Sequence, residues 1–168
     1  IIRRVDHPAA RTAGEILSRQ LDASYVYLRN INKRGIGRID AILLGPHGAL
    51  VLAVLDREGR FRIVGRRWMR ADRRGEWSLM NTNPTNTVIE AVRRVRAYLR
   101  EEGLGEVPVS GAIVFTRDAP IVRFEAQQPD VPVVYARNIP ALVRDIRGTQ
   151  PIVNPAILQA TVNLLYDR

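Results

Sequence analysis

The chain of 168 residues lacks cysteine, which excludes disulfide bonds and thiolate metal sites. No signal peptide is visible, and no apolar run approaches the roughly 18 residues that a membrane-spanning helix requires, so we expect no span within this segment. Lysine is nearly absent, because Lys33 is the only lysine among 26 basic residues. The two histidines, His7 and His47, have no metal-ligand spacing, and we expect both to be surface or capping residues.

The positive charge is the strongest compositional signal. The net charge is +9, and between Arg57 and Arg74 eight arginines are accompanied by only two acids, Glu58 and Asp72. A basic surplus favours polyanions, with nucleic acid first and an anionic membrane surface second.

The arginine-rich segment is predicted to form a β-hairpin, with strands at Phe61–Val64 and Arg67–Met69 around Gly65. In one interpretation its arginines hold phosphates, and an exposed indole of Trp68 or Trp77 stacks a base. In the other, the arginines form a solvated sheet edge and both tryptophans are core. We favour the phosphate role for the arginines and the core role for the tryptophans. The predicted nucleic-acid-binding residues are Arg62, Arg66, Arg67, Arg70, Arg73 and Arg74, with Arg93 and Arg96 on an exposed helix face.

The apolar periodicity predicts an α/β domain. The stretch Gly37–Gly59 reads as two buried strands joined by a turn at residues 45–48, and the longest helix begins at Asn83-Pro84 and ends at Gly103. The other expected elements are a helix over Asp6–Ser24, strands over Tyr25–Ile31, Val109–Thr116 and Val131–Tyr135, and helices over Pro140–Arg147 and from Pro155 onward. This order predicts a three-layer α/β/α-type sandwich with a central mixed β-sheet.

We expect one domain over residues 1–168. Because the first residue is Ile1 rather than Met, we also expect the domain to be excised from a longer protein. The expected location is cytoplasmic, with membrane anchoring through flanking segments left open.

Four stretches carry a family resemblance: Gly14-Glu15 on the first helix, residues 37–40 (GRID), residues 48–52 (GALVL), and Asn83-Pro84. Their order and spacing resemble the nuclease-related domain (NERD) family, over roughly Ala13 to Thr116. That family belongs to the PD-(D/E)xK nuclease-like superfamily, so the resemblance implies a restriction-endonuclease-like core. It also implies that Glu15 and Asp40 match two acidic positions of the family.

The chain departs from the family pattern where the family carries an acid and a lysine on one face of a strand. The matching positions are Ala53 and Leu55, and a glutamine that the family often shows on the long helix appears as Thr87. Phosphodiester hydrolysis in such a site needs two acidic ligands for a divalent cation, and a lysine that stabilises the charged transition state. We therefore predict a degenerate site with remnant positions Glu15 and Asp40, weak metal binding if any, and no cofactor unless residual activity uses Mg²⁺.

Other roles remain open for the acids. Asp40 is equally readable as a structural carboxylate bonded to a neighbouring backbone amide or to an arginine such as Arg38, and Glu15 as a solvated helix residue. Three functions follow: a degenerate nuclease-related domain that binds nucleic acid or acts as an interaction module; an active metal-dependent nuclease whose missing acid has migrated to Asp56, Glu58 or Glu90; and a structural or oligomerisation domain. In the last case the partner is another copy of the chain, another domain of the same protein, or an acidic protein.

Overall fold

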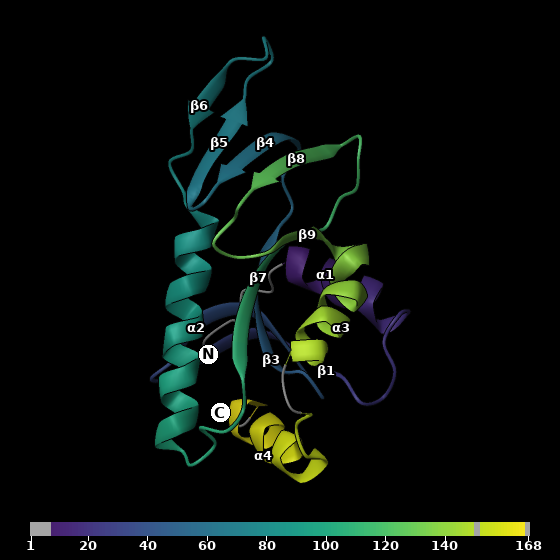
Figure 1. The fold of residues 1–168 in the computed structure, drawn as a ribbon, viewed down its shortest axis with the longest axis vertical. Helices are drawn as coiled ribbons and strands as arrows, with labels where there is room; N and C mark the ends of the chain where they lie inside the picture. The colour runs from purple at the N-terminus through teal and green to yellow at the C-terminus, as the bar shows by residue number, and fades with distance from the viewer. Residues whose placement is uncertain (1–7, 150–151, 167–168) are drawn as a thin grey trace, which may run out of the picture.

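The computed structural model describes residues 8–149 and 152–166. Helices cover both faces of a central five-stranded sheet with strand order β1-β2-β3-β7-β9, as Figure 1 shows. Strand β2 runs antiparallel to its neighbours β1 and β3, whereas β3, β7 and β9 are parallel, so the sheet is mixed. The strands are β1 (Val26–Lys33), β2 (Gly37–Gly45), β3 (Gly48–Leu55), β7 (Val109–Phe115) and β9 (Val133–Tyr135).

Two pairs of helices complete the three layers. One face of the central sheet packs against α1 and α3, through a cluster that includes Leu17, Leu50 and Val143. The other face packs against α2 and α4, through a cluster that includes Val51, Val95 and Leu165. The helices are α1 (Pro8–Ser18), α2 (Pro84–Glu101), α3 (Ile139–Thr149) and α4 (Pro155–Tyr166), with a short 3-10 helix, η1, at Ala136–Asn138. The predicted α/β/α sandwich with a mixed sheet is confirmed.

A second sheet stands beside the N-terminal end of α2 (Figure 1). It has four strands in the order β6-β5-β4-β8, at Trp77–Leu79, Arg67–Ala71, Gly59–Val64 and Val122–Gln127 respectively. The hairpin predicted around Gly65 is confirmed as β4 and β5, which pair antiparallel. Strand β8 pairs parallel to β4.

The two sheets share a third cluster, here called the inter-sheet cluster. It contains Phe61 and Trp68 from the second sheet, Phe115 from β7 and Val88 from α2, all at most 1% exposed. The Phe61 and Phe115 ring centroids are 5.0 Å apart. Burial of such aromatic side chains is a major source of stability, so this cluster fixes the second sheet on the central one.

Several sequence-based boundaries were wrong. No strand was predicted between Val109–Thr116 and Val131–Tyr135, yet Val122-Arg123-Phe124-Glu125-Ala126 alternates apolar and polar residues and forms β8. Helix α1 ends at Ser18 rather than Ser24, since the Asp22 side chain accepts hydrogen bonds from Ser24 and forms a turn there. Helix α3 continues through Gly148 to Thr149. None of the described helices is long and apolar enough to cross a membrane.

Candidate functional site

Asp40 lies where the regular alternation of β2 breaks. Ile39 and Ile42 are three residues apart yet pack in the same cluster, and the facing strand carries Asn30 with φ of +53°. Pairing between β2 and β3 extends only to Ala41, the residue that follows Asp40 in the chain, and the Asp40 Oδ2 accepts a hydrogen bond from the Val54 amide at 3.0 Å. The carboxylate therefore replaces a ladder bond at the end of β3.

The negative charge of Asp40 also affects the pKa of Tyr27 on β1. Burial, and after it the negative charge of Asp40, raises the pKa of Tyr27 above its ordinary value. The neutral hydroxyl donates to the Ala10 carbonyl at 2.6 Å, and this bond connects β1 to α1. Asp40 is thus a partly buried carboxylate that accepts a backbone hydrogen bond near the core.

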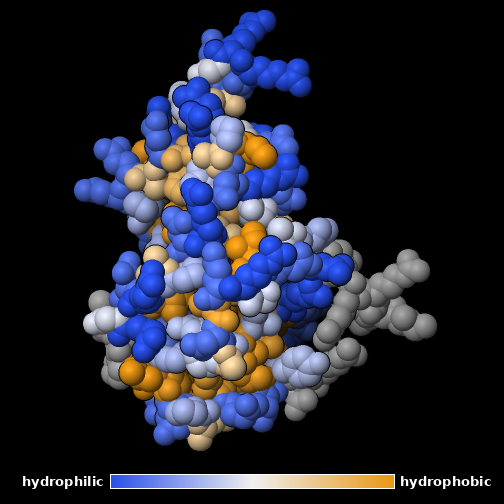
Figure 2. All heavy atoms as spheres, turned by 90° about the vertical axis from the view of Figure 1, so that its right-hand side faces the viewer, coloured by the Kyte–Doolittle hydropathy of each residue, from blue (hydrophilic) through white to orange (hydrophobic). Residues whose placement is uncertain are grey.

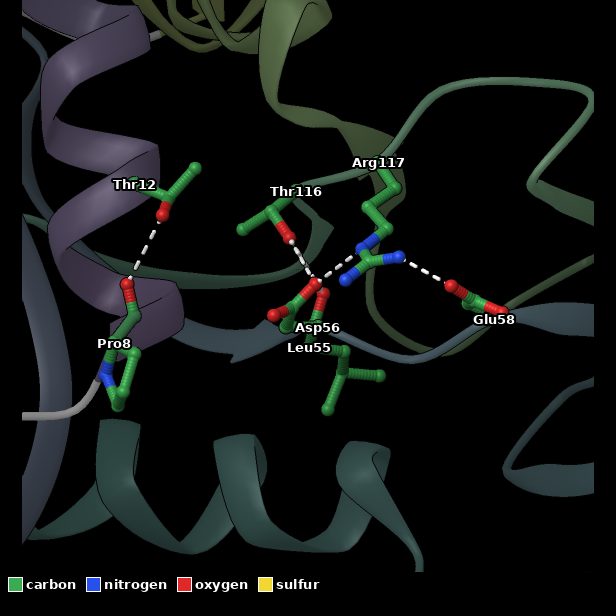
Figure 3. Close-up of polar contacts among 7 residues, drawn as sticks. All are labelled: Pro8, Thr12, Leu55, Asp56, Glu58, Thr116 and Arg117. Carbon is green, nitrogen blue, oxygen red and sulfur yellow. Dashed lines mark hydrogen bonds and ion pairs between the residues drawn. The ribbon is translucent and has the colours of Figure 1, made fainter.

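Ala53 and Leu55 point together to the inter-sheet cluster. Ala53 is 7% exposed within that cluster, and Leu55 packs against it with Ile89 of α2. In Figure 3 the Leu55 side chain points toward α2 and away from Arg117. The strand face on which the resemblance expects an acid and a lysine is therefore apolar and packed.

Glu15 lies on the solvent side of α1. Its side chain is 64% exposed and forms an ion pair with Arg11, one helical turn away, at 3.6 Å. Helix α1 packs with Val54 in the cluster that also contains Leu17. Ala53, the preceding residue of β3, belongs instead to the inter-sheet cluster. In the described residues no three His, Asp or Glu side chains come together as possible metal ligands.

The end of β3 carries a charge cluster made by Asp56, Glu58, Thr116 and Arg117 (Figure 3). The Arg117 Nε donates to Asp56 Oδ1 at 2.8 Å, and its Nη1 donates to Glu58. Thr116 Oγ1 donates to the same Asp56 oxygen at 3.2 Å. The hydrogen bond to Asp56 is the main cause that raises the pKa of Arg117. One guanidinium therefore holds both acids that follow β3.

Sequence reasoning missed Arg117, although its position carries a signal. Strands β3 and β7 are parallel, with Leu55 opposite Phe115, so the residues that follow them meet at one edge of the sheet. Asp56 comes directly after β3, and Thr116-Arg117 directly after β7. The third acid considered for a migrated site, Glu90, is on α2, where it pairs with Arg93 at 3.0 Å.

The predicted phosphate-binding arginines lie in several separate parts of the structure. Side chains that point away from the inter-sheet cluster form what we call the outer face of the second sheet. Its strand residues are Arg60, Arg62, Val64, Arg67, Met69, Ala71, Trp77, Leu79, Arg123, Glu125 and Gln127. Arg73 and Arg74 lie in the β5–β6 turn, where the Asp72 carboxylate accepts amide hydrogen bonds from Arg74 and Glu76 at 2.8 and 2.9 Å. This turn forms the hydrophilic tip at the top of Figure 2.

The remaining predicted arginines are engaged elsewhere. Arg66 pairs with Asp130 at 2.7 Å beside the β4–β5 turn, and Arg70 donates to the Glu58 carbonyl at 2.5 Å. Arg93 and Arg96 lie on α2 rather than in the second sheet, and Arg96 donates to the Val109 carbonyl at 2.9 Å. The structure therefore does not gather all eight arginines into one surface.

The two tryptophans have different environments. Trp68 is 1% exposed, and its indole nitrogen donates to Thr85 Oγ1 at 2.7 Å, so its predicted core role is confirmed. Trp77 is partly exposed on the outer face, and the Arg62 guanidinium lies over its ring, 4.3 Å from the centroid. The prediction of a core role for Trp77 was wrong, because β6 is the edge strand and its indole points away from the inter-sheet cluster.

His47 was expected on the surface and is instead buried, with 1% of its area exposed. Its Nε2 lies 3.0 Å from the Leu43 carbonyl and donates to it, because a carbonyl only accepts. Burial lowers the pKa of His47 to about 4. The imidazole is a neutral structural group between β2 and β3, and His7 lies outside the described residues.

A mixed sheet between two helical layers defines an α/β domain with a restriction-endonuclease-like core. A sequence profile for the nuclease-related domain matches residues 6–116, and the chain belongs to this NERD family. No curated protein and no solved structure matches the chain.

Proposed function

We propose that this nuclease-related domain binds nucleic acid and does not cleave it. The observation that carries the proposal is the basic surface of the second sheet. Within the described residues, no carboxylate lies within ion-pair distance of Arg60, Arg67, Arg73, Arg74 or Arg123. Arginines that are not neutralised by acids attract phosphates and release the counterions of the nucleic acid.

The side-chain packing and ion pairs at the end of β3 support the proposed loss of catalysis. A glutamate at position 53 or a lysine at position 55 would supply the missing charge, but Ala53 and Leu55 pack in the inter-sheet cluster. The nearest acids in sequence, Asp56 and Glu58, are held by Arg117. A divalent cation would have to displace that guanidinium, which disfavours the alternative of a nuclease with a migrated acid.

The test is a binding titration with a labelled DNA duplex of about 20 base pairs, repeated between about 50 and 200 mM salt. We expect binding that weakens with salt, and a triple variant Arg67→Ala, Arg73→Ala and Arg74→Ala that binds about tenfold or more weakly with a smaller salt slope. The matched control removes three exposed arginines elsewhere, Arg19→Ala, Arg100→Ala and Arg144→Ala. Equal losses in both triple variants would refute a dedicated surface. No binding at low salt would favour the interaction domain with an acidic protein partner.

The same protein is then incubated with plasmid and single-stranded DNA in Mg²⁺ or Mn²⁺. We expect no cleavage above background. Cleavage that disappears in Asp40→Asn would restore the nuclease alternative. Asn is the better control than Ala, because its side-chain oxygen still accepts the Val54 hydrogen bond.

A further inference from the structure

Trp77 is a tryptophan held on a surface rather than in a core. It belongs to none of the three apolar clusters of the described residues, in contrast to Trp68. Two guanidinium groups contact its ring instead, with Arg62 at 4.3 Å and Arg60 at 5.5 Å from the centroid. These cation–π contacts orient the indole without covering it fully.

The strand register explains how the indole reaches the arginines. Ala71 of β5 is paired with Trp77 of β6, and it follows Arg70, whose partner Phe61 on β4 comes directly after Arg60. Because the Ala71 side chain is a single methyl group, the indole and the guanidinium meet across β5. The aromatic ring therefore lies over the sheet, between the edge strand and the arginines of β4.

Most charged strand residues of the outer face are arginines. Arg60 lies beside Arg123 in the β4–β8 register. Among the outer-face strand residues the single carboxylate is Glu125, which is 3.6 Å from Arg62. An open pocket of about 380 Å³ adjoins this surface, and its lining includes Arg60, Arg123, Trp77 and Tyr135 together with Glu125. Aromatic rings and unneutralised arginines thus surround a space large enough for a planar group.

We propose that the outer face binds single-stranded nucleic acid, with one base stacked on Trp77 and phosphates held by Arg60 and Arg123. The proposal rests on the proposed function and specifies its ligand. A duplex presents phosphates and keeps its bases stacked inside, so it gains nothing from an aromatic ring on a sheet face. A single strand presents both groups, and an exposed aromatic ring accepts any base.

The experiment compares oligothymidine and oligouridine of about 15 nucleotides with a mixed-sequence duplex, using the whole chain. We expect Trp77→Ala to bind both single strands about tenfold more weakly and to change duplex binding by less than about twofold. Leu79→Ala is the matched control, because Leu79 is an apolar side chain, 67% exposed, on the same strand and face. It should bind both kinds of probe like the parent chain.

Trp77→Phe shows whether Trp77→Ala loses affinity because of misfolding rather than because stacking is lost. A phenyl ring still stacks, so this variant should retain most of the affinity. The parent chain should also show indole fluorescence quenching by oligothymidine, and Trp77→Phe should not, since Trp68 is buried. If the parent chain binds the probes and Trp77→Ala binds single strands equally well, the stacking site is refuted and the proposed function stands. If the parent chain binds no probe at low salt, both proposals fail.

Discussion

Protonation of the His47 imidazole makes the stability of the folded chain depend on pH. Its pKa in the folded chain is about 4, against 6.5 for a free side chain, because burial disfavours the charged form. The unfolded chain therefore binds a proton between these values while the folded chain does not. The stability contributed by the neutral ring is present above about pH 6.5 and is lost as the pH falls toward 4.

We predict that the free energy of unfolding falls by about 2 kcal/mol between pH 7 and pH 5 through His47. Urea unfolding at the two pH values measures it. His47→Gln removes the titrating group, so its stability should change much less over the same interval. An equally steep fall in His47→Gln would show that other groups cause the pH dependence.

At this scale the sequence left the contacts of single side chains largely undetermined. Asp40 and Ala53 were singled out because the family resemblance matches them to positions of the family pattern, and the apolar surroundings of Ala53 follow from its neighbours. The Val54 hydrogen bond of Asp40 was one of two open alternatives, because it depends on where pairing between β2 and β3 stops. The burial of His47 depends on tertiary packing that a Gly-Pro-His-Gly turn does not encode.

Among the elements, α2 packs unusually close to β7. A Cβ atom at Gly111 would lie 2.4 Å from Val88 Cγ1 and 2.8 Å from Val92 Cγ2. Both valines are on the buried side of the helix, so the helix has to move away from the sheet to make room. Close approach of the backbone is the role of this glycine.

We predict that Gly111→Ala destabilises the chain by about 1–3 kcal/mol through overpacking. The matched control is Gly148→Ala, because Gly148 lies in α3 and a Cβ atom added there would have no other atom within 4 Å. Alanine there should be neutral or stabilising by up to about 1 kcal/mol, as a better helix former. Thermal unfolding of the two variants gives the comparison. A Gly111→Ala variant as stable as the parent would show that α2 shifts at no cost.

The elements themselves were largely predictable, because apolar periodicity reports local structure. Helix α2 shows this well: Asn83 caps it by accepting from the Asn86 amide at 3.1 Å, and Pro84 occupies its first turn. Strand β8 alternates regularly and was still missed, since its neighbours suggest a loop. Its partner β4 lies about sixty residues earlier in the chain, and local patterns do not specify such parallel pairing.

At the scale of the molecule, the inter-sheet cluster couples the two sheets. Phe115 of the central sheet contacts both Phe61 and Trp68 of the second sheet, with ring centroids 5.0 and 6.1 Å apart. All three side chains are at most 1% exposed. Separation of the sheets would expose them together, so the second sheet has no independent core of comparable size.

We therefore predict that the chain unfolds in one cooperative transition. Both tryptophans belong to the second sheet, so indole fluorescence reports on that sheet. Far-UV circular dichroism reports mainly on the helices that flank the central sheet. The two signals should have the same midpoint in urea. A fluorescence midpoint at clearly lower urea would mean that the second sheet melts first.

The basic strand residues of the outer face are all arginines, which limits how their charge can be regulated. Lysine charge is removed by acetylation, whereas arginine keeps its charge when methylated and is protonated throughout the physiological pH range. Lys33, the single lysine, lies at the end of β1 and donates to the Leu164 carbonyl of α4, outside the second sheet. The outer face therefore has no acetylation switch and no proton switch among its basic groups, and the polyanion binding proposed above would depend on the ionic composition of the surroundings.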